Sequence, residues 1–278
     1  MLQNMISIDQ AGQLAAAAGV PLYSSDLYMP SYLDGRVGRW RLTRTGFCLD
    51  RGYHSGLWGV SGMPVLMRNS SENGERWETW MSLSPHEIES QELGCRYAFG
   101  HTAVMGLGMG WVAVNIAINP AVRKVTVVER DPEVIDLFAQ SGVLAGLSAE
   151  IADKIRIVRA DALEWVPEEA VDFLYADIWR CLEESQTLDD VRRMQANAGA
   201  GGIYFWGQEL AIHTLAAKRP EGCADNREWA QVVRSCVSDT IRLPLLLPDD
   251  FDYPGMIAEV VRRRSERRPD SVKKEAAP

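Results

Sequence analysis

The segment 102–130 limits the possible folds of this chain more than any other segment. It begins with an apolar run, Thr102–Met105, that is typical of a buried β-strand, and it continues with a helical pattern at 109–118. Three glycines lie between the two: Gly106, Gly108 and Gly110. A second apolar run, Lys124–Val128, ends at the acidic residue Glu129. This order predicts a strand, a glycine-rich turn, a helix and a second, parallel strand.

The glycine turn and the acidic strand end together predict a nucleoside-binding crevice. Glycines have no Cβ, so the backbone and the N-terminus of the helix can approach a ligand closely. Glu129 follows Gly110 by nineteen residues, and its carboxylate can accept hydrogen bonds from ribose hydroxyls. Parallel sheets bind ligands at the carboxyl edge, where both features would meet. The alternative interpretation is a structural turn followed by an ordinary strand that binds no ligand. The three regularly spaced glycines together with Glu129 favour the nucleoside-binding crevice over it.

The spacing of the glycines bears on which nucleoside binds. Dinucleotide-binding turns usually have a third small residue at the position that Trp111 occupies here, which disfavours a nicotinamide-dependent dehydrogenase. The G-x-G-x-G pattern instead resembles the class I S-adenosylmethionine (SAM)-dependent methyltransferase superfamily, and within it the spermidine-synthase-like branch. Four segments carry the resemblance: Val104–Gly110, Lys124–Ile135, Ile155–Ala162 and Val171–Ile178.

The resemblance implies an α/β fold with a Rossmann-like, doubly wound, mostly parallel sheet and a small N-terminal antiparallel β region. It also implies SAM as the cofactor, or decarboxylated SAM for an aminopropyltransferase. In the resembled superfamily the residue at the position of Asp161 contacts the adenine amino group, and Asp161 could equally cap a helix at 162–165. Nine residues are expected to contact the cofactor: Gly106, Leu107, Gly108, Gly110, Glu129, Arg130, Asp161, Ala162 and Asp177.

Asp177 follows the fourth predicted strand and is the candidate catalytic residue. A carboxylate at the end of a buried strand must be solvated or paired, and the carboxyl edge of such a sheet offers both. Asp177 could accept a proton from a nucleophile or hold an ammonium group. Bonding to backbone amides explains its position equally well. Four residues are candidates for lining the acceptor side, although tryptophans more often pack in a core: Trp80, Met81, Trp111 and Trp179.

Three functions remain open on these residues. The first is a SAM-dependent methyltransferase that acts on a small-molecule acceptor, with Asp177 as the base. The second is transfer of an aminopropyl or other SAM-derived alkyl group, as in spermidine synthases. Their tyrosine and histidine positions correspond here to Met81 and Ser82, and their second aspartate to Arg180, which weakens polyamine binding. The third is a non-catalytic SAM-binding module, indicated by the apolar Met81, Ile178 and Trp179 on the substrate side.

Composition narrows the partners and the compartment. The formal net charge of −9 disfavours nucleic acid, because a phosphate backbone rewards a concentrated positive surface. The five cysteines form no C-x-x-C pair and the four histidines have no metal-ligand spacing, so we expect reduced thiols and no metal. No apolar stretch approaches membrane-spanning length. We expect a soluble, cytoplasmic protein with a small-molecule acceptor and no nucleic-acid or membrane partner. A homodimer is left open.

Periodicity and turn signals divide the chain into three parts. Residues 1–83 are expected to hold a helix and the small β region, 84–261 the SAM-binding domain, and 262–278 a charged, disordered tail. Helices are predicted at 8–18, from Ser84, from Asp131, at Leu188–Ala198 and at Asn226–Val237, antiparallel strands within 32–81, and an edge strand at Ile241–Leu247.

Overall fold

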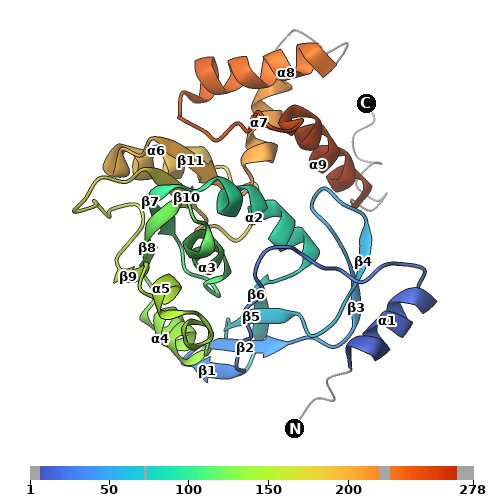
Figure 1. Ribbon diagram of the computed structural model, residues 1–278. Helices are drawn as coiled ribbons and strands as arrows, with labels where there is room; N and C mark the ends of the chain where they lie inside the picture. Colours follow the sequence, from blue (N-terminus) through green and yellow to red (C-terminus); the bar gives the residue numbers. More distant parts are fainter. Residues whose placement is uncertain (1–6, 72–73, 219–225, 268–278) are drawn as a thin grey trace. The chain divides into compact units, whose positions relative to one another are not determined.

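The computed structural model describes residues 7–71, 74–218 and 226–267 (Figure 1). The chain divides into two compact units, Met1–Trp206 and Gly207–Pro278. The first contains all the named strands, and the second contains helices. The predicted domain boundaries after residues 83 and 261 stay predictions.

A five-stranded parallel sheet is the centre of the first unit. Its strands are β7 (Gly100–Met105), β8 (Val122–Glu129), β9 (Ile155–Arg159), β10 (Phe173–Ala176) and β11 (Gly202–Phe205). They lie in the order β11-β10-β7-β8-β9, and every neighbouring pair is parallel. The chain runs outward from β7 to β9 and then returns to place β10 on the other side of β7. This order confirms the predicted Rossmann-like sheet, with its switch point between β7 and β10.

Helices cover both faces of this sheet. They are α2 (Pro85–Tyr97), α3 (Trp111–Ile118), α4 (Pro132–Gln140), the short α5 (Ala149–Ala152) and α6 (Thr187–Ala198), with a 3₁₀ turn η1 (Leu144–Gly146) after α4. Right-handed crossovers place α3 and α4 on one face and α6 on the opposite face. β7 and β10 are consequently buried on both sides, as parallel strands between helix layers are.

The predicted helix starts are confirmed by their caps. The Ser84 hydroxyl accepts a hydrogen bond from Glu87 N, and Pro85 occupies the first position of α2. The Asp131 carboxylate accepts from Glu133 N at the start of α4. Near the N-terminus of the chain, Ser7 caps α1 (Ile8–Ala17) in a capping box.

The N-terminal β region is antiparallel, as predicted. Its strands are β1 (Gly35–Val37), β2 (Trp40–Arg44), β3 (Cys48–Arg51), β4 (Leu57–Val60), β5 (Pro64–Asn69) and β6 (Trp77–Ser82). A four-stranded sheet has the order β1-β2-β5-β6, and β3 pairs with β4 in a separate hairpin. The sheet is joined to α4 because Trp40 Nε1 donates to Asp131 Oδ2 over 2.8 Å and Arg39 N donates to Glu133 Oε2 over 2.9 Å. It therefore lies beside the end of β8.

The second unit differs from the sequence predictions at two places. It comprises α7 (Gln208–Ala216), α8 (Asn226–Ser235), a π-helical segment η2 (Cys236–Ile241) and α9 (Tyr253–Arg267). The predicted strand Ile241–Leu247 was wrong, because the helical segment runs to Ile241 and Arg242 then takes a left-handed φ of 57°. Pro244 has no backbone N–H to contribute to a ladder, and Leu245 after it forms a single β-bridge rather than a strand.

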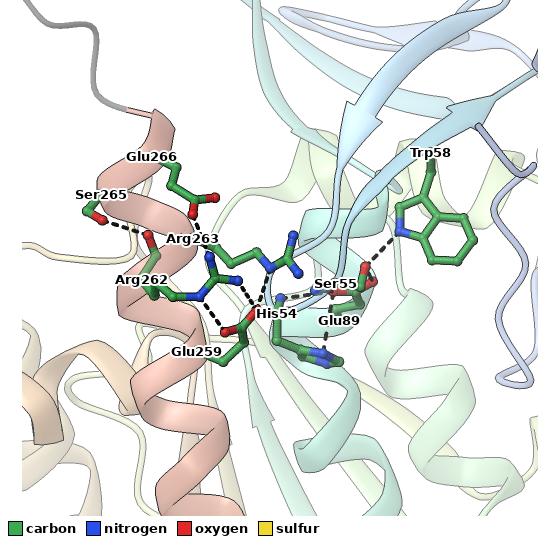
Figure 2. A network of polar contacts seen from close by, with 9 residues as sticks. All are labelled: His54, Ser55, Trp58, Glu89, Glu259, Arg262, Arg263, Ser265 and Glu266. Carbon is green, nitrogen blue, oxygen red and sulfur yellow. Dashed lines mark hydrogen bonds and ion pairs between the residues drawn. The ribbon is translucent and has the colours of Figure 1, made fainter. Parts of the chain in front are cut away.

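The prediction of a disordered tail from residue 262 is wrong for 262–267, which the structure describes as helix. Residues 262–267 continue helix α9, and 268–278 lie outside the described residues. Glu259 explains the continuation, because its carboxylate pairs with Arg262 and Arg263 one turn further along, each over 2.6 Å (Figure 2). Such pairs three and four residues apart support an exposed helix.

In the first unit, the alternative prediction that Asp161 caps a helix at 162–165 was also wrong, since that segment is a turn.

Candidate functional site

Three acidic residues and the glycine turn form a row along the carboxyl edge of the parallel sheet. In the order of the strands, Asp161 follows β9, Glu129 ends β8, Gly106 follows β7 and Asp177 follows β10. Backbone hydrogen bonds continue past the strand ends, from Asp177 N to Met105 O and from Gly106 N to Val128 O, both over 2.9 Å. Neighbouring strands are about 4.8 Å apart, so the row spans roughly 14 Å. The sequence predicted that these residues meet at one edge of the sheet, and the structure places them there. Their role as a nucleoside-binding crevice stays a prediction.

The glycine turn is held by close approaches that a side chain would block. Gly106 has a φ of 96°, and a Cβ on it would lie 2.1 Å from the backbone oxygen of Asp177. Gly108 has a φ of 52°, and a Cβ on it would lie 2.5 Å from Met81 Sδ. The turn therefore packs against the end of β10 on one side and against β6 on the other. Gly110, also at positive φ, forms the N-cap of α3.

Glu129 is oriented by the backbone on both sides of it. Its Oε2 accepts a hydrogen bond of 3.1 Å from Leu107 N, and its Oε1 accepts one of 2.8 Å from Asp131 N. Each carboxylate oxygen has a further lone pair, and the side chain is only partly buried. Glu129 can thus accept from a ligand while it fixes the glycine turn. Leu107 is buried and Arg130 is exposed.

Asp161 lies at the far end of the row. Its Oδ1 accepts a hydrogen bond of 2.9 Å from Leu163 N, and its Oδ2 lies 3.9 Å from the Arg130 guanidinium. The carboxylate shapes the turn at 162–165, and the side chain is 40% exposed. Ala162, beside it, is buried.

Asp177 belongs to a polar cluster whose other members the sequence analysis did not select. Gln91 Nε2 donates to Glu87 Oε1 over 2.7 Å and lies 3.4 Å from Asp177 Oδ2. Burial raises the pKa of Asp177 from 3.8 to about 7. Burial, and then the charge of Asp177, raise the pKa of Glu87 well above its ordinary value. The candidate base Asp177 and the carboxyl of Glu87 therefore both lie within hydrogen-bond distance of the same neutral amide, that of Gln91.

The position of helix α2 explains why Glu87 and Gln91 reach this edge. A Cβ at Gly94 would lie 2.4 Å from the ring of Tyr175 in β10, so the helix packs directly on the strand. The Ser90 carbonyl accepts a hydrogen bond of 2.8 Å from the Tyr204 hydroxyl. Glu87 and Gln91 are four residues apart and share a face of α2. That spacing was visible in the sequence, but which face of the helix meets Asp177 depends on the packing.

The acceptor-lining candidates take different positions. The Trp111 ring is 1% exposed and its Nε1 donates to Tyr28 O, so it packs inside the unit. Trp179 is 7% exposed and its Nε1 donates to Asp190 Oδ2 over 2.8 Å. Trp80 is half-buried, with the guanidinium of Arg180 5.3 Å from its ring centroid. Of the four, Met81 is the one that the structure places against the glycine turn, over Gly108.

A buried carboxylate fastens the β3–β4 hairpin to helix α2. Glu89 is 4% exposed, and its Oε2 accepts hydrogen bonds from His54 N and Ser55 N over 3.0 and 3.1 Å (Figure 2). The Ser55 hydroxyl donates to Oε1 and accepts from Trp58 Nε1 over 2.7 Å. This network holds the helix that carries Glu87 and Gln91 against the N-terminal β region.

Three features of the described residues concern metals, thiols and membranes. No group of three or more His, Cys, Asp or Glu side chains in ranges 7–71, 74–218 and 226–267 is arranged to hold a metal ion. Four cysteines are free thiols, Cys48, Cys95, Cys181 and Cys236, and Cys223 lies outside the described residues. None of the helices that the structure describes combines the length and hydropathy of a membrane-spanning segment.

No protein-family model and no curated protein matches this chain. Among solved structures, it is similar to the glycopeptide N-methyltransferase MtfA complexed with SAM, with 20% identity and a TM-score of 0.32 over 40% of this chain and 43% of that chain. It is also similar to the 23S rRNA methyltransferase ErmE, with 20% identity and a TM-score of 0.30 over 40% of each chain. A third is the precorrin-6y C5,15-methyltransferase from Geobacter metallireducens, with 13% identity and a TM-score of 0.31 over 41% of this chain and 58% of that chain. The overlap thus covers less than half of MtfA's length.

Proposed function

We propose that this chain is a SAM-dependent methyltransferase of the class I superfamily and that it acts on a small-molecule acceptor. The observation that carries the proposal is the row at the carboxyl edge, in which Glu129 and Asp177 flank the turn at Gly106. A glycine turn next to an oriented carboxylate suits the ribose of a nucleoside. Asp177 then lies one strand further along the row, on the other side of the turn.

Each residue of the row would contact a different part of the bound SAM. Glu129 would accept hydrogen bonds from the ribose hydroxyls, since Leu107 N and Asp131 N already fix its orientation. Asp161 would accept from the adenine amino group through Oδ2, the carboxylate oxygen that Leu163 N does not contact. The backbone at Gly106 and Gly108 would lie against the ligand, because no Cβ intervenes. When bound, SAM supplies a methyl group made electrophilic by the positive charge of its sulfonium.

Asp177 supplies the base that a protonated acceptor needs. Its pKa, raised to about 7 by burial, lies near neutral pH, where a general base is both available and strong enough to accept a proton. Catalysis otherwise depends on holding the acceptor in line with the methyl group. The half-buried Met81, which lies over Gly108, would exclude water from that side of the site.

Methyl transfer is tested by incubating the protein with SAM and a panel of amine, hydroxyl, thiol and carbon acceptors, and measuring S-adenosylhomocysteine. We expect turnover with at least one class, and a loss of roughly a hundredfold or more in the Asp177→Asn variant. If SAM binds tightly and no acceptor class is methylated, the chain is a SAM-binding module without this chemistry.

Aminopropyl transfer, the reaction of the spermidine-synthase-like branch, is the second candidate. The pair of carboxyls at Glu87 and Asp177 favours it, because an amine acceptor carries a positive charge that such a pair can bind. Incubation with decarboxylated SAM and putrescine separates the two reactions. If methylthioadenosine is the product, the chain is an aminopropyltransferase and not a methyltransferase.

A further inference from the structure

A polar cavity lies on the antiparallel sheet of the N-terminal β region. Its volume is about 350 Å³, and residues of β1, β2 and β6 line it, together with Asp34 and Glu75, which precede β1 and β6. A space of this size can hold a small organic molecule. None of the residues of the row at the carboxyl edge is among those that line the cavity. The cavity is therefore a second place on the chain where a ligand could bind.

Two of the lining residues are arginines that lie directly opposite each other. Arg36 in β1 and Arg41 in β2 are register partners, so their side chains leave the sheet on the same face. Their guanidinium carbons lie 4.9 and 6.0 Å from the ring centroid of Trp77, which attracts both cations. Like charges directly opposite each other destabilise a pair of strands. An anion bound beside both guanidinium groups would offset their repulsion.

The carboxylates around the cavity neutralise only part of this charge. Asp34 Oδ1 lies 3.2 Å from Nε of Arg44, an arginine that does not line the cavity. Glu75 Oε1 accepts a hydrogen bond of 2.7 Å from Arg36 Nη1. Arg41 has no ion pair within the described ranges of the chain. The cavity therefore has one more guanidinium group than its carboxylates pair with.

Glu75 already places one carboxylate in this charged environment. The pKa of Glu75 is lowered first by the hydrogen bond and the charge of Arg36, then by the Trp77 N–H, and also by the charge of Arg41. This N–H is buried, yet it completes no hydrogen bond with a described residue. The Glu75 side chain is 63% exposed, and an exposed ion pair contributes little to stability. An anion from solution can therefore displace this carboxylate.

We propose that this cavity binds the carboxylate or phosphate group of a small organic molecule, which takes the place of the Glu75 carboxylate beside Arg36 and Arg41. A guanidinium group presents a planar fork of N–H donors that matches both kinds of oxyanion. The Trp77 N–H supplies a further donor. The displaced Glu75 side chain turns into the solvent, which already reaches most of it. This inference goes beyond the proposed function and does not depend on it, because the two sites share no residue.

The indole N–H resonance of Trp77 reports binding at this cavity. It is followed by NMR spectroscopy of the isotope-labelled full chain and is assigned by its loss in Trp77→Phe. The probes are benzoate, phenyl phosphate and benzamide, which has the shape of benzoate without its charge. We expect at least one of the two anions to move this resonance in a saturable way, and benzamide to leave it in place. The anion that binds more tightly identifies the group that the ligand carries.

Two substitutions with opposite expected effects assign the binding to the cavity. Arg41→Gln should weaken binding of the tighter anion about threefold or more, because it removes the guanidinium group that has no ion pair. Glu75→Gln should strengthen binding about threefold or more, because the neutral amide no longer competes for the two arginines. Thermal unfolding checks that both variants retain the fold.

Neighbouring residues that do not line the cavity provide the matched controls. Arg76→Gln removes a guanidinium group that is 78% exposed and pairs with Glu78 over 3.3 Å, and Glu78→Gln removes the carboxylate of the same pair. Both variants should bind the anion as the wild type does.

Four results would overturn the proposal. If all three probes move the Trp77 resonance equally, or none moves it, the cavity does not select an oxyanion. Equal losses in Arg41→Gln and Arg76→Gln would mean that the surface as a whole attracts anions. If Glu75→Gln binds no more tightly than the wild type, or no more tightly than Glu78→Gln, the anion does not take the place of the Glu75 carboxylate.

Discussion

The backbone carbonyl of Asp177 lies directly against Gly106, where a Cβ atom would be 2.1 Å from the oxygen. Gly106 also has a φ of 96°, in the region that favours glycine. The end of β10 and the turn after β7 are therefore joined by a contact that only glycine permits. This contact sets the distance between the base and the glycine turn before any ligand binds.

Gly106→Ala should consequently destabilise the fold. Strain at positive φ and overlap with a backbone oxygen together should lower the free energy of unfolding by about 2–5 kcal/mol, measured by urea denaturation. Gly199→Ala is the control, since Gly199 has a φ of 59° and no heavy atom within 4 Å of the added Cβ. It should lose only ~1–2 kcal/mol from strain. Equal losses in the two variants would mean that the close approach is not needed.

Asp177 should make the stability of the protein fall as the pH rises. Its folded pKa of about 7 lies above its ordinary value of 3.8, so between these pH values the folded chain holds a proton that the unfolded chain has lost. Asp177→Asn should match the wild type near about pH 4 and exceed it near about pH 8, by at most ~4 kcal/mol. Urea denaturation at both pH values gives the comparison. A difference that does not change with pH would contradict the buried, protonated state.

The rate of methyl transfer should rise as Asp177 loses its proton. We expect kcat/KM to increase with pH and to level off above the Asp177 pKa of about 7. In Asp177→Asn the remaining activity should lose this increase. The measurement is the pH profile of S-adenosylhomocysteine formation under subsaturating acceptor. A profile that keeps its shape in the variant would assign the proton transfer to another group.

Glu89 should matter for stability rather than for chemistry. Glu89→Ala removes the acceptor of His54 N, Ser55 N and the Ser55 hydroxyl, and should cost about 3–5 kcal/mol, read from urea denaturation. Glu92→Ala, on the same helix, removes a partly exposed pair with Arg96 and should cost about 1 kcal/mol or less. A small loss in both variants would show that the β3–β4 hairpin is held by other contacts.

Much of the fold was predictable because its signals are local. The glycines from Gly106 to Gly110, the caps at Ser84 and Asp131, and the alternating strands within 32–81 each combine one turn or cap signal with one periodic run. The row of Glu129, Asp161 and Asp177 followed from strand ends in a parallel sheet. The wrong strand at Ile241–Leu247 came from an apolar run whose first residue ends the helical segment η2 and whose second, Arg242, has a left-handed φ of 57°, which the apolar pattern does not reveal.

The acceptor side could not be predicted from the sequence because it depends on which faces meet. Glu87 and Gln91 lie in a polar helix, and the packing of Gly94 on Tyr175 together with the hydrogen bond from Tyr204 to Ser90 O places their face at Asp177. Trp111 was a candidate for lining the acceptor side, but it is 1% exposed and its indole N–H donates to Tyr28 O. Side chains next to a motif can point into the core or into the site, and a linear pattern does not distinguish them.

Calorimetric titration with SAM and S-adenosylhomocysteine tests the central claim most directly. The wild type should bind both, and Glu129→Ala should bind each about tenfold or more weakly, because it loses charged hydrogen bonds to the ribose. Glu150→Ala, which removes an exposed carboxylate from α5, should bind as the wild type does. Absence of binding in the wild type, or equal binding by Glu129→Ala, would contradict the nucleoside site between Gly106 and Glu129.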